Sequence, residues 1–370
     1  MRIGIFAGAA GRQASGPETY EHCLLKALAE IDRETEYRVF CFSQAAANSF
    51  AIEQENFQFE ILRPKVRWLS LPISLPMAMN KAQVGLCHAT FVPPPFSPKP
   101  LVMTLHGSDM FVHPEFFHPT VRWRLTALLR RGFKHAALVI CVSQHVRDVV
   151  QERFKLPDDR LAVIHHGIES SFQPMSAEVA TTHVATKYGI TKPYIFYAGK
   201  IVSSKNIERL VDAFRGFRRA YEADVQLVLA GKSYPRMGRI QETLWQAAEA
   251  EGVLRIGHVP HNDLPYLYCA ARVFAFPSLW EGFGLPVAEA MACGVPVITS
   301  NNSCLQEIAG DAALLVDPYS TEEIQDALTR LFFDEVLRAE LRKKGLQRAT
   351  SFNWNETAKQ TRAAYERALT

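Results

Sequence analysis

Two glutamates flank a glycine pair in the last third of the chain. The segment WEGFGLPVAE contains Glu281 before Gly282 and Gly284, and Glu289 after them. Glycine lets the backbone come close to a ligand, and Pro286 suits the first turn of a helix. The amides and partial positive charge at a helix N-terminus form a site for phosphate. The spacing therefore indicates a phosphate site between two carboxylates, and the alternative is a glycine turn with two solvated carboxylates.

Two lysines follow another apolar run. Lys200 ends the segment PYIFYAGK, and Lys205 comes shortly after it. Ammonium groups at a strand end could stabilise the negative charge that develops on a leaving diphosphate. The sequence has no Asp-x-Asp motif, and the adjacent His165 and His166 would point to opposite sides of a strand and chelate poorly. We expect no metal ion and no other cofactor.

Short apolar runs alternate with helical patterns along the chain, which predicts parallel sheets covered on both faces. The predicted strands cover residues 2–8, 36–43, 84–90, 100–107, 136–143 and 160–167, then 193–200, 225–232, 254–260, 271–278, 294–300 and 312–318. The predicted helices cover residues 17–29, 120–133, 144–154, 206–220, 240–252 and 354–369.

The chain of 370 residues is too long for one core. The stretch 172–193 has no long apolar run and is interpreted as the connection between two domains. We therefore expect two Rossmann-like, doubly wound α/β domains, residues 1–175 and 176–352. Ligands of such sheets bind outside the carboxyl ends of the strands, and a cleft between domains is the expected site.

The glycine-rich segment, continued as WEGFGLPVAEAMACGVPVI, resembles the donor-binding signature of family 4 glycosyltransferases, which are retaining enzymes with the GT-B fold. The resemblance implies that Glu281 lies beside the transferred sugar and that Glu289 binds the ribose. It also implies that the backbone from Gly282 through Phe283 and Gly284 to Leu285 holds the diphosphate.

The segment YAGKIVSSKNIERLVDAF resembles the family's basic stretch. This resemblance implies that Lys200 and Lys205 contact the diphosphate and that Lys205 takes part in catalysis. The segment RIGHVPHNDLPYLYCAARVFAFPS resembles the part of the family that meets the nucleobase, which implies a donor contact near Val259.

Resemblances in the first half are looser. GPETY resembles the first-domain glycine loop, which implies that Gly16 approaches the donor phosphate or the acceptor, although Ser15 stands where the family often has a second glycine. MTLHGSD resembles the strand that ends in a catalytic histidine, here His106, and Asp109 is the candidate acceptor contact. SFNWNETA resembles the start of the terminal helix, which implies that residues 353–370 pack back on the first domain.

Composition restricts the partners and the compartment. The net charge of +3 argues against nucleic-acid binding. No targeting segment and no apolar run of about 20 residues is visible, so we expect a cytoplasmic protein that is soluble or attached to the inner membrane surface. The seven cysteines are scattered singly, which indicates free thiols in a reducing compartment.

Residues 121–135 combine basic and apolar side chains at helical spacing. One interpretation is a domain helix with a solvated basic face. The other is a surface that docks an anionic or lipid-linked acceptor at a membrane. The basic residues are Arg122, Arg124, Arg130, Arg131 and Lys134.

We expect a retaining glycosyltransferase that moves a hexosyl group from a UDP- or GDP-sugar to a hydroxyl of a glycan, a glycolipid or a small molecule. Such an enzyme would act in the synthesis of cell-surface polysaccharides or glycoconjugates. A sugar-nucleotide epimerase on the same architecture is the alternative, and it would need no acceptor. A binding protein with a degenerate site is a third hypothesis. No Gly-x-Gly-x-x-Gly opens the first helix of either domain, which disfavours a dinucleotide oxidoreductase.

Overall fold

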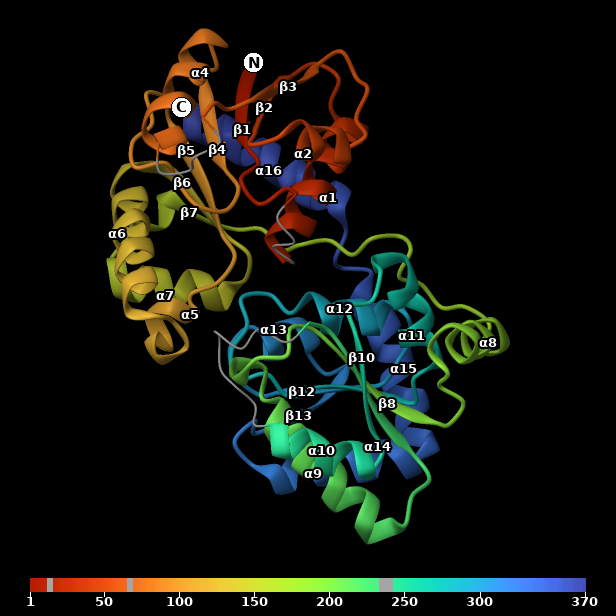
Figure 1. The fold of residues 1–370 in the computed structure, drawn as a ribbon. Coiled ribbons are helices and arrows are strands. Elements are labelled where there is room, and N and C mark those ends of the chain that lie inside the picture. The colour runs from red at the N-terminus through yellow and green to blue at the C-terminus, as the bar shows by residue number, and fades with distance from the viewer. Residues whose placement is uncertain (12–15, 65–68, 233–241) are drawn as a thin grey trace. The chain divides into compact units, whose positions relative to one another are not determined.

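The computed structural model describes residues 1–11, 16–64, 69–232 and 242–370 (Figure 1). The chain divides into two compact units: residues 1–167 with 353–370, and residues 168–352. Ser15 and the first two residues of the helix expected over 240–252 lie outside the described residues.

The first unit is built on a seven-stranded parallel sheet with the order β3-β2-β1-β4-β5-β6-β7. The inner strands β4 and β5 are buried along their whole length, as expected for a sheet covered on both faces. The strands are β1 (Arg2–Phe6), β2 (Glu36–Cys41), β3 (Phe57–Ile61), β4 (Leu86–Ala89), β5 (Leu101–Leu105), β6 (Ala136–Cys141) and β7 (Leu161–Val163).

The edge strand β3 was not among the predicted strands. Its sequence, FQFEI, alternates apolar and polar residues instead of forming the continuous apolar run that marks the central strands. It pairs only with β2, so one of its edges carries no partner strand within the described sheet. A strand at such a position needs less apolar surface, which explains why a search for apolar runs misses it.

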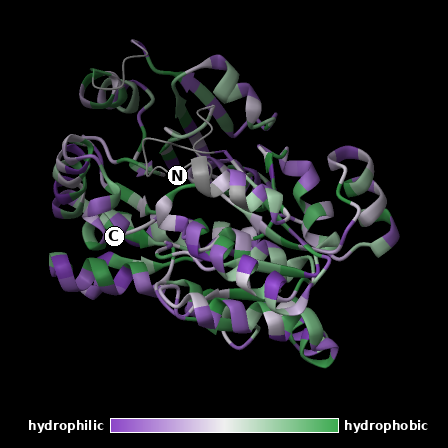
Figure 2. Ribbon diagram, turned by 60° about the horizontal axis from the view of Figure 1, so that its bottom comes forward, coloured by the Kyte–Doolittle hydropathy of each residue, from purple (hydrophilic) through white to green (hydrophobic). Residues whose placement is uncertain are grey.

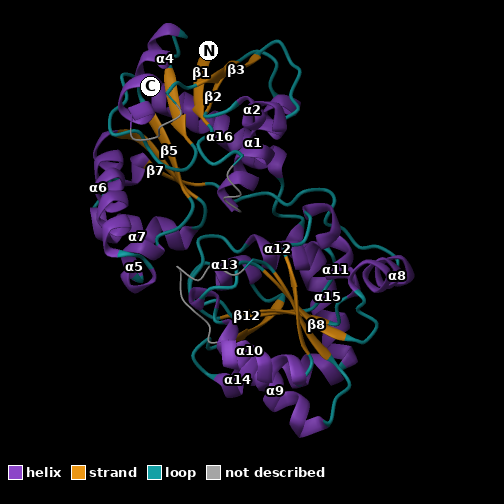
Figure 3. Ribbon diagram, viewed as in Figure 1, coloured by secondary structure: helices purple, strands orange, loops and turns teal. Residues whose placement is uncertain are grey.

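Helices cover the first sheet, and the C-terminal helix is one of them (Figure 3). Helix α16 packs against α1 and contributes Trp354, Ala358 and Tyr365 to the core of this unit. The helices are α1 (Gly16–Ile31), α2 (Gln44–Ser49), α4 (Leu75–Lys81), α5 (Asp109–Val112), α6 (Pro119–His135), α7 (Gln144–Phe154) and α16 (Trp354–Leu369), with short turns η1 (Ser70–Ser74), η2 (Pro114–Phe116) and η3 (Asp158–Arg160).

The second unit contains a six-stranded parallel sheet with the order β10-β9-β8-β11-β12-β13. Its strands are β8 (Tyr194–Ala198), β9 (Gln226–Ala230), β10 (Val253–Gly257), β11 (Val273–Phe276), β12 (Val297–Ser300) and β13 (Ala313–Val316). Its helices are α8 (Ala177–Tyr188), α9 (Ile207–Tyr221), α10 (Glu242–Ala250), α11 (Leu264–Ala270), α12 (Leu285–Ala292), α13 (Leu305–Ala309), α14 (Thr321–Phe333) and α15 (Glu335–Ala349), with turns η4 (Ser203–Lys205) and η6 (His261–Asp263).

Both sheets are doubly wound, as the sequence predicts. In each, the first strand lies in the middle of the sheet and the winding reverses beside it, between β1 and β4 and between β8 and β11. Figure 2 shows hydrophobic residues concentrated on the strands and mixed hydropathy along the helices. The loops that leave two neighbouring strand ends at a reversal diverge, which leaves room for a ligand there.

The stretch 172–193 is not the plain connection that its composition predicts. It contains α8, which packs against α11 within the second unit. Ser176 caps the beginning of the helix by accepting a hydrogen bond from the Val179 amide, and Gly189 ends it in the left-handed conformation. These capping residues were the available sign of a helix, because α8 has no apolar run and buries only Ala180 and Val184.

No helix among the described residues is long and apolar enough to cross a bilayer. All seven cysteines are free thiols, and six of them are buried, with Cys269 half-buried.

A buried carboxyl group organises the loop after β1. Both oxygens of Glu21 accept hydrogen bonds from backbone amides, at 3.0 Å from Ala9 and 2.7 Å from Ala10. The hydroxyl of Thr90 lies 2.5 Å from the same carboxyl group and 2.8 Å from the carbonyl of Phe6. Burial raises the pKa of Glu21 to about 7, against the lowering effect of these hydrogen bonds.

We expect the carboxyl group of Glu21 to stabilise the protein through the loop after β1. Glu21→Ala leaves the two amides without their partner, so we expect a loss of about 2–3 kcal/mol in the free energy of unfolding. Because the folded-state pKa is raised, the wild type should lose stability relative to Glu21→Gln as the pH rises from about 4.5 towards 7. Urea unfolding at pH 5 and pH 8 measures both effects.

Glu30→Ala is the matched control, because Glu30 lies on the same helix with an exposed side chain. It should leave the unfolding free energy nearly unchanged at both pH values. Equal losses in Glu21→Ala and Glu30→Ala would contradict the role given to Glu21.

Candidate active site

The reversal point of the second sheet brings together Lys205 and Glu281, which are 76 residues apart in the sequence. Lys205 follows β8 and Glu281 follows β11, the neighbouring strand. The Nζ atom of Lys205 donates a hydrogen bond to Oε1 of Glu281 at 2.6 Å, and the two side chains are 20% and 13% exposed. This pair combines a cation and an anion in a partly dehydrated position, where charges act more strongly than in water.

Asn206 fixes the turn that carries Lys205. It adopts the left-handed conformation at φ +57° and begins helix α9. Its side-chain amide donates to the carbonyls of Pro277 at 3.0 Å and Pro318 at 2.6 Å, which follow β11 and β13. The amide of Leu279 adds a bond to the carbonyl of Ser204. Asn206 was not among the predicted site residues, and its side chain makes no hydrogen bond to the first turn of α9 that a capping pattern could have indicated.

Two residues that follow β12 form hydrogen bonds to the segment that contains Glu281. The backbone amide of Glu281 donates to the hydroxyl of Ser303 at 3.3 Å. The side chain of Asn302 donates to the carbonyl of Leu279 at 3.0 Å. Glu281 is therefore positioned by the ends of two neighbouring strands, which restricts where its carboxylate can point.

Lys200 adds a second cation near the pair. It follows Gly199 at the end of β8, and its carbonyl accepts a hydrogen bond from the hydroxyl of Tyr197 at 2.9 Å. Burial lowers the pKa of Lys200, and the charge of Lys205 lowers it further, against the opposing effect of Glu281. An anionic ligand would relieve this repulsion, so the two lysines suit a group with more than one negative charge.

The predicted glycine turn leads into α12. Gly284 lies at the N-cap with φ +87°, and the eight-residue helix begins at Leu285. A helix N-terminus carries a partial positive charge that favours phosphate. The side chain of Phe283 is buried and packs edge-on against Phe352, so a ligand contact of this residue would come from its backbone.

Glu289 lies inside α12 and is almost completely buried. Its Oε2 atom accepts a hydrogen bond from the hydroxyl of Tyr268 at 3.0 Å. Burial raises the pKa of Glu289 to about 7, while the charge of His261 and the bond from Tyr268 oppose this rise. His261 itself pairs with Glu169 at 2.7 Å. Tyr268, His261 and Glu169 were not predicted as site residues, although Tyr268 and His261 lie in the segment 255–278 that resembles the nucleobase part of the family.

Val259 lies in the loop after β10, where Gly257 adopts φ +70° and its carbonyl accepts from the amide of Gly231 at 2.7 Å. Val259 is buried. A contact with a nucleobase at this loop would therefore depend on the backbone more than on the side chain.

The first unit holds the other predicted residues. His106 follows β5, and its Nε2 lies 2.6 Å from the carbonyl of Thr90, which can only accept, so Nε2 carries the proton. Burial lowers the pKa of His106 to about 4, which keeps the ring neutral at pH 7. Gly16 is the first residue of α1, and Asp109 is the first residue of α5. A neutral His106 can accept a hydrogen bond from a hydroxyl through Nδ1.

Within the part of the chain that the structure describes, no group of three or more histidine, cysteine, aspartate or glutamate side chains is arranged to hold a metal ion.

Comparisons with known proteins place the chain in a family. Residues 14–172 match the model of Glycosyltransferase Family 4, and residues 183–348 match that of Glycosyl transferases group 1. The chain is 35% identical over 271 residues to O-antigen chain mannosyltransferase B of Escherichia coli, which covers 72% of this chain and 70% of that protein. The chain belongs to glycosyltransferase family 4.

Solved structures agree with the fold of this glycosyltransferase. Sucrose-phosphate synthase from Thermosynechococcus elongatus superposes with a TM-score of 0.79 at 22% identity, over 99% of this chain and 98% of that one. HepE of Anabaena, in complex with UDP and glucose, gives a TM-score of 0.77 at 17% identity, over 99% of each chain. The glycosyltransferase therefore has the GT-B fold, with two Rossmann-like domains.

Gly284→Ala should destabilise the glycosyltransferase. A Cβ atom at this position would lie 2.7 Å from Cδ2 of Leu305 and would stand on a backbone at φ +87°. We expect a loss of about 1–3 kcal/mol in unfolding free energy, measured by urea denaturation.

The matched control is Gly16→Ala, where the added Cβ atom would meet nothing within 4 Å. This control should unfold like the wild type. If Gly284→Ala were as stable as Gly16→Ala, the turn would not require its glycine.

Proposed function

We propose that this glycosyltransferase moves a hexosyl group from a UDP- or GDP-linked sugar to an acceptor hydroxyl and retains the anomeric configuration. The observation that carries the proposal is the pairing of Lys205 with Glu281 at the reversal of the second sheet, directly before the turn into α12. The retention of configuration rests on the family.

In this proposal the donor diphosphate lies against Lys200, Lys205 and the backbone of Gly282–Leu285. The bond between the sugar C1 atom and the diphosphate breaks, and its electron pair leaves with the diphosphate. The acceptor oxygen bonds to C1, and its proton passes to an oxygen of the departing diphosphate. The two ammonium groups and the helix N-terminus stabilise the charge that grows on the leaving group. The site thus supplies positive charge through the protein itself, and we propose that no metal ion is needed.

The sugar and the ribose would each meet a carboxylate. Glu281 would accept hydrogen bonds from hydroxyls of the transferred sugar, and Glu289 from the ribose. In the first unit, His106 would accept a hydrogen bond from the sugar, Gly16 would approach the donor phosphate or the acceptor, and Asp109 would contact the acceptor. We assign the nucleotide and most other contacts of the donor to the second unit, and the acceptor to the first.

We propose mannose as the transferred sugar and a glycan or lipid-linked saccharide as the acceptor, in the synthesis of a cell-surface polysaccharide. The support is the relative from Escherichia coli, whose name specifies mannosyl transfer to an O-antigen chain. The complex of HepE with UDP and glucose supports a nucleotide-linked donor through a neighbour of the same fold.

The test is product formation by enzyme treated with EDTA and gel-filtered. GDP-mannose and UDP-glucose are each offered with α-mannoside acceptors, and NMR identifies the anomer of the product. We expect the α configuration of the donor in the product and full activity without added metal. A β-linked product would overturn retention, and activity that returns only with Mg²⁺ or Mn²⁺ would overturn the metal-free site. An isomerised donor without transfer would favour an epimerase.

Two variants belong to the same assay. Lys205→Ala should lower turnover by about 10²- to 10³-fold, the scale for removing one preorganised charge donor. Glu281→Ala should lower turnover far more than donor affinity. The control is Lys192→Ala, which should keep the activity. Lys192 is a half-exposed lysine of the second unit that pairs with Asp224.

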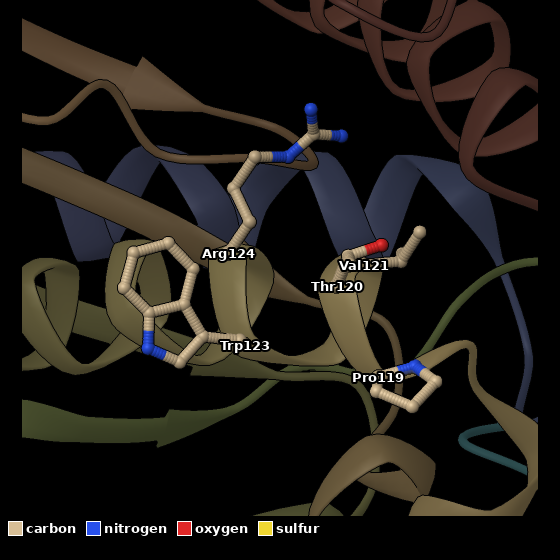
Figure 4. A pocket seen from close by; sticks show the side chains of 5 residues that line it. All are labelled: Pro119, Thr120, Val121, Trp123 and Arg124. Atoms are coloured by element: carbon tan, nitrogen blue, oxygen red, sulfur yellow. The ribbon is translucent and has the colours of Figure 1, made fainter.

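We also propose that helix α6 brings the enzyme to an anionic membrane surface. Residues 119–124 of this helix are all exposed, and Trp123 is 76% exposed. An open pocket of about 540 Å³ is lined by Pro119, Thr120, Val121, Trp123 and Arg124 (Figure 4). Val121 belongs to the apolar positions of the helical pattern, yet it is exposed, whereas Leu129 and Phe133 are buried.

Further exposed apolar side chains lie close to the basic residues of α6. Helix α5 packs against α6, and its residue Val112 is exposed. Phe96 is also exposed, and it follows Pro95, whose carbonyl accepts a hydrogen bond from Arg131 of α6. Exposed aromatic and apolar groups among arginines are typical of surfaces that lie in the headgroup region of anionic lipid. The cytoplasmic face of the inner membrane is the surface we propose.

Vesicle sedimentation tests this contact. The wild type should bind vesicles of phosphatidylcholine mixed with phosphatidylglycerol at low salt, and bind less at high salt, because ions screen the attraction. Trp123→Ser, and separately the pair Arg130→Ser with Arg131→Ser, should bind less. Arg33→Ser, which removes an exposed arginine elsewhere in this unit, should bind like the wild type. A wild type that binds no vesicles would refute the proposal.

A further inference from the structure

The side chain of Tyr268 is a fixed hydrogen-bond donor next to the candidate ribose site. It is completely buried in α11, and its hydroxyl donates to Oε2 of Glu289 at 3.0 Å. Its ring is surrounded by those of Phe172, Phe196 and Phe274, with centroids at 5.9, 5.2 and 5.2 Å. A ring enclosed on several sides cannot change its rotamer without disturbing the core.

Helix α11 is itself anchored at both ends of its first turn. The hydroxyl of Tyr194 on β8 donates to the carbonyl of Leu267 at 2.7 Å. Asp263, directly before the helix, accepts hydrogen bonds from His183 at 3.1 Å and Tyr188 at 2.8 Å, both on α8. Helix α11, which carries Tyr268, is therefore held by β8 and α8 through contacts that do not involve Glu289.

Glu289, in contrast, has a flexible side chain on a short helix. Among the described residues, the bond from Tyr268 is the hydrogen bond that the structure gives to its carboxyl group. A buried carboxyl group that lost this partner could rotate or take up a proton to avoid an unsatisfied charge. Burial and the adjacent Glu289 raise the pKa of Tyr268, so its hydroxyl keeps the proton that it donates.

We propose that Tyr268 is a positioning residue for nucleotide binding: by occupying Oε2 of Glu289, it directs Oε1 to the ribose hydroxyls of the donor. This inference rests on the proposed function, because it takes Glu289 as the ribose contact. Tyr268 contacts no part of the donor in this arrangement. Its contribution reaches the ligand only through the orientation of the carboxylate.

In this proposal the ribose and the diphosphate of the nucleotide are bound by different groups. The diphosphate is assigned to Lys200, Lys205 and the turn into α12, and none of these groups contacts Tyr268 in the hydrogen bonds described. Loss of the Tyr268 hydroxyl should therefore weaken a nucleotide that has ribose hydroxyls and leave one without them unaffected. A general loss of structure would weaken both.

The experiment is calorimetric titration of the wild type and Tyr268→Phe with UDP and GDP, and with the 2′,3′-dideoxy form of each. For the nucleotide that binds, the wild type should prefer the ribose form by about tenfold or more, as expected for hydrogen bonds to a charged group. Tyr268→Phe should reduce this preference by about three- to tenfold. Its affinity for the dideoxy form should match that of the wild type.

Two further variants distinguish the possible failures. Tyr194→Phe removes another buried tyrosine hydroxyl that bonds to α11 but not to Glu289, so it should keep the wild-type preference. Glu289→Gln should lose most of the preference. If the wild type showed no preference for the ribose form, or if Glu289→Gln kept the wild-type preference, the assignment of Glu289 to the ribose would be wrong. If Glu289→Gln lost the preference while Tyr268→Phe kept it, only the role of Tyr268 would be refuted.

Discussion

The ion pair between Lys205 and Glu281 depends on where a parallel sheet reverses its winding. All strands of the second sheet are parallel, so their carboxyl ends lie along one edge. The chain begins this sheet in the middle, builds outward through β9 and β10, and returns to the other side of β8 with β11. The segments after β8 and β11 therefore begin side by side, and a lysine on one meets a glutamate on the other.

Carboxyl groups have different roles in the two units. In the first unit, Glu21 accepts hydrogen bonds from the amides of Ala9 and Ala10, and Glu18 accepts one from Gly11. Amides of the loop after β1 are thus engaged by the protein's own carboxyl groups. In the second unit, two lysines and a helix N-terminus converge near a carboxylate. This difference supports the assignment of the donor diphosphate to the second unit, where positive charge is concentrated.

Burial also sets the protonation of the groups that could handle a proton. The ring of His106 is held neutral, because burial lowers its pKa to about 4 and Nε2 donates to a backbone carbonyl. It is suited to accept a hydrogen bond and unsuited to donate a proton at neutral pH. Glu289 is buried with a raised pKa, and the hydroxyl of Tyr268 counteracts that rise. The orientation of both groups is restricted by hydrogen bonds to their neighbours.

The sequence alone determined the two doubly wound sheets, because central parallel strands must be apolar on both faces and are visible as continuous runs. It also indicated Glu281, Glu289, Lys200 and Lys205 as candidates for chemistry, through the apolar runs and the glycine pair beside them and through the resemblance to a family signature. It did not reveal β3 or α8, whose positions require little apolar surface. Only the tertiary structure decided that Lys205 pairs with Glu281, that Asn206 holds the turn and that Tyr268 reaches Glu289. These contacts join segments far apart in the chain, and local pattern carries no information about which strand ends become neighbours.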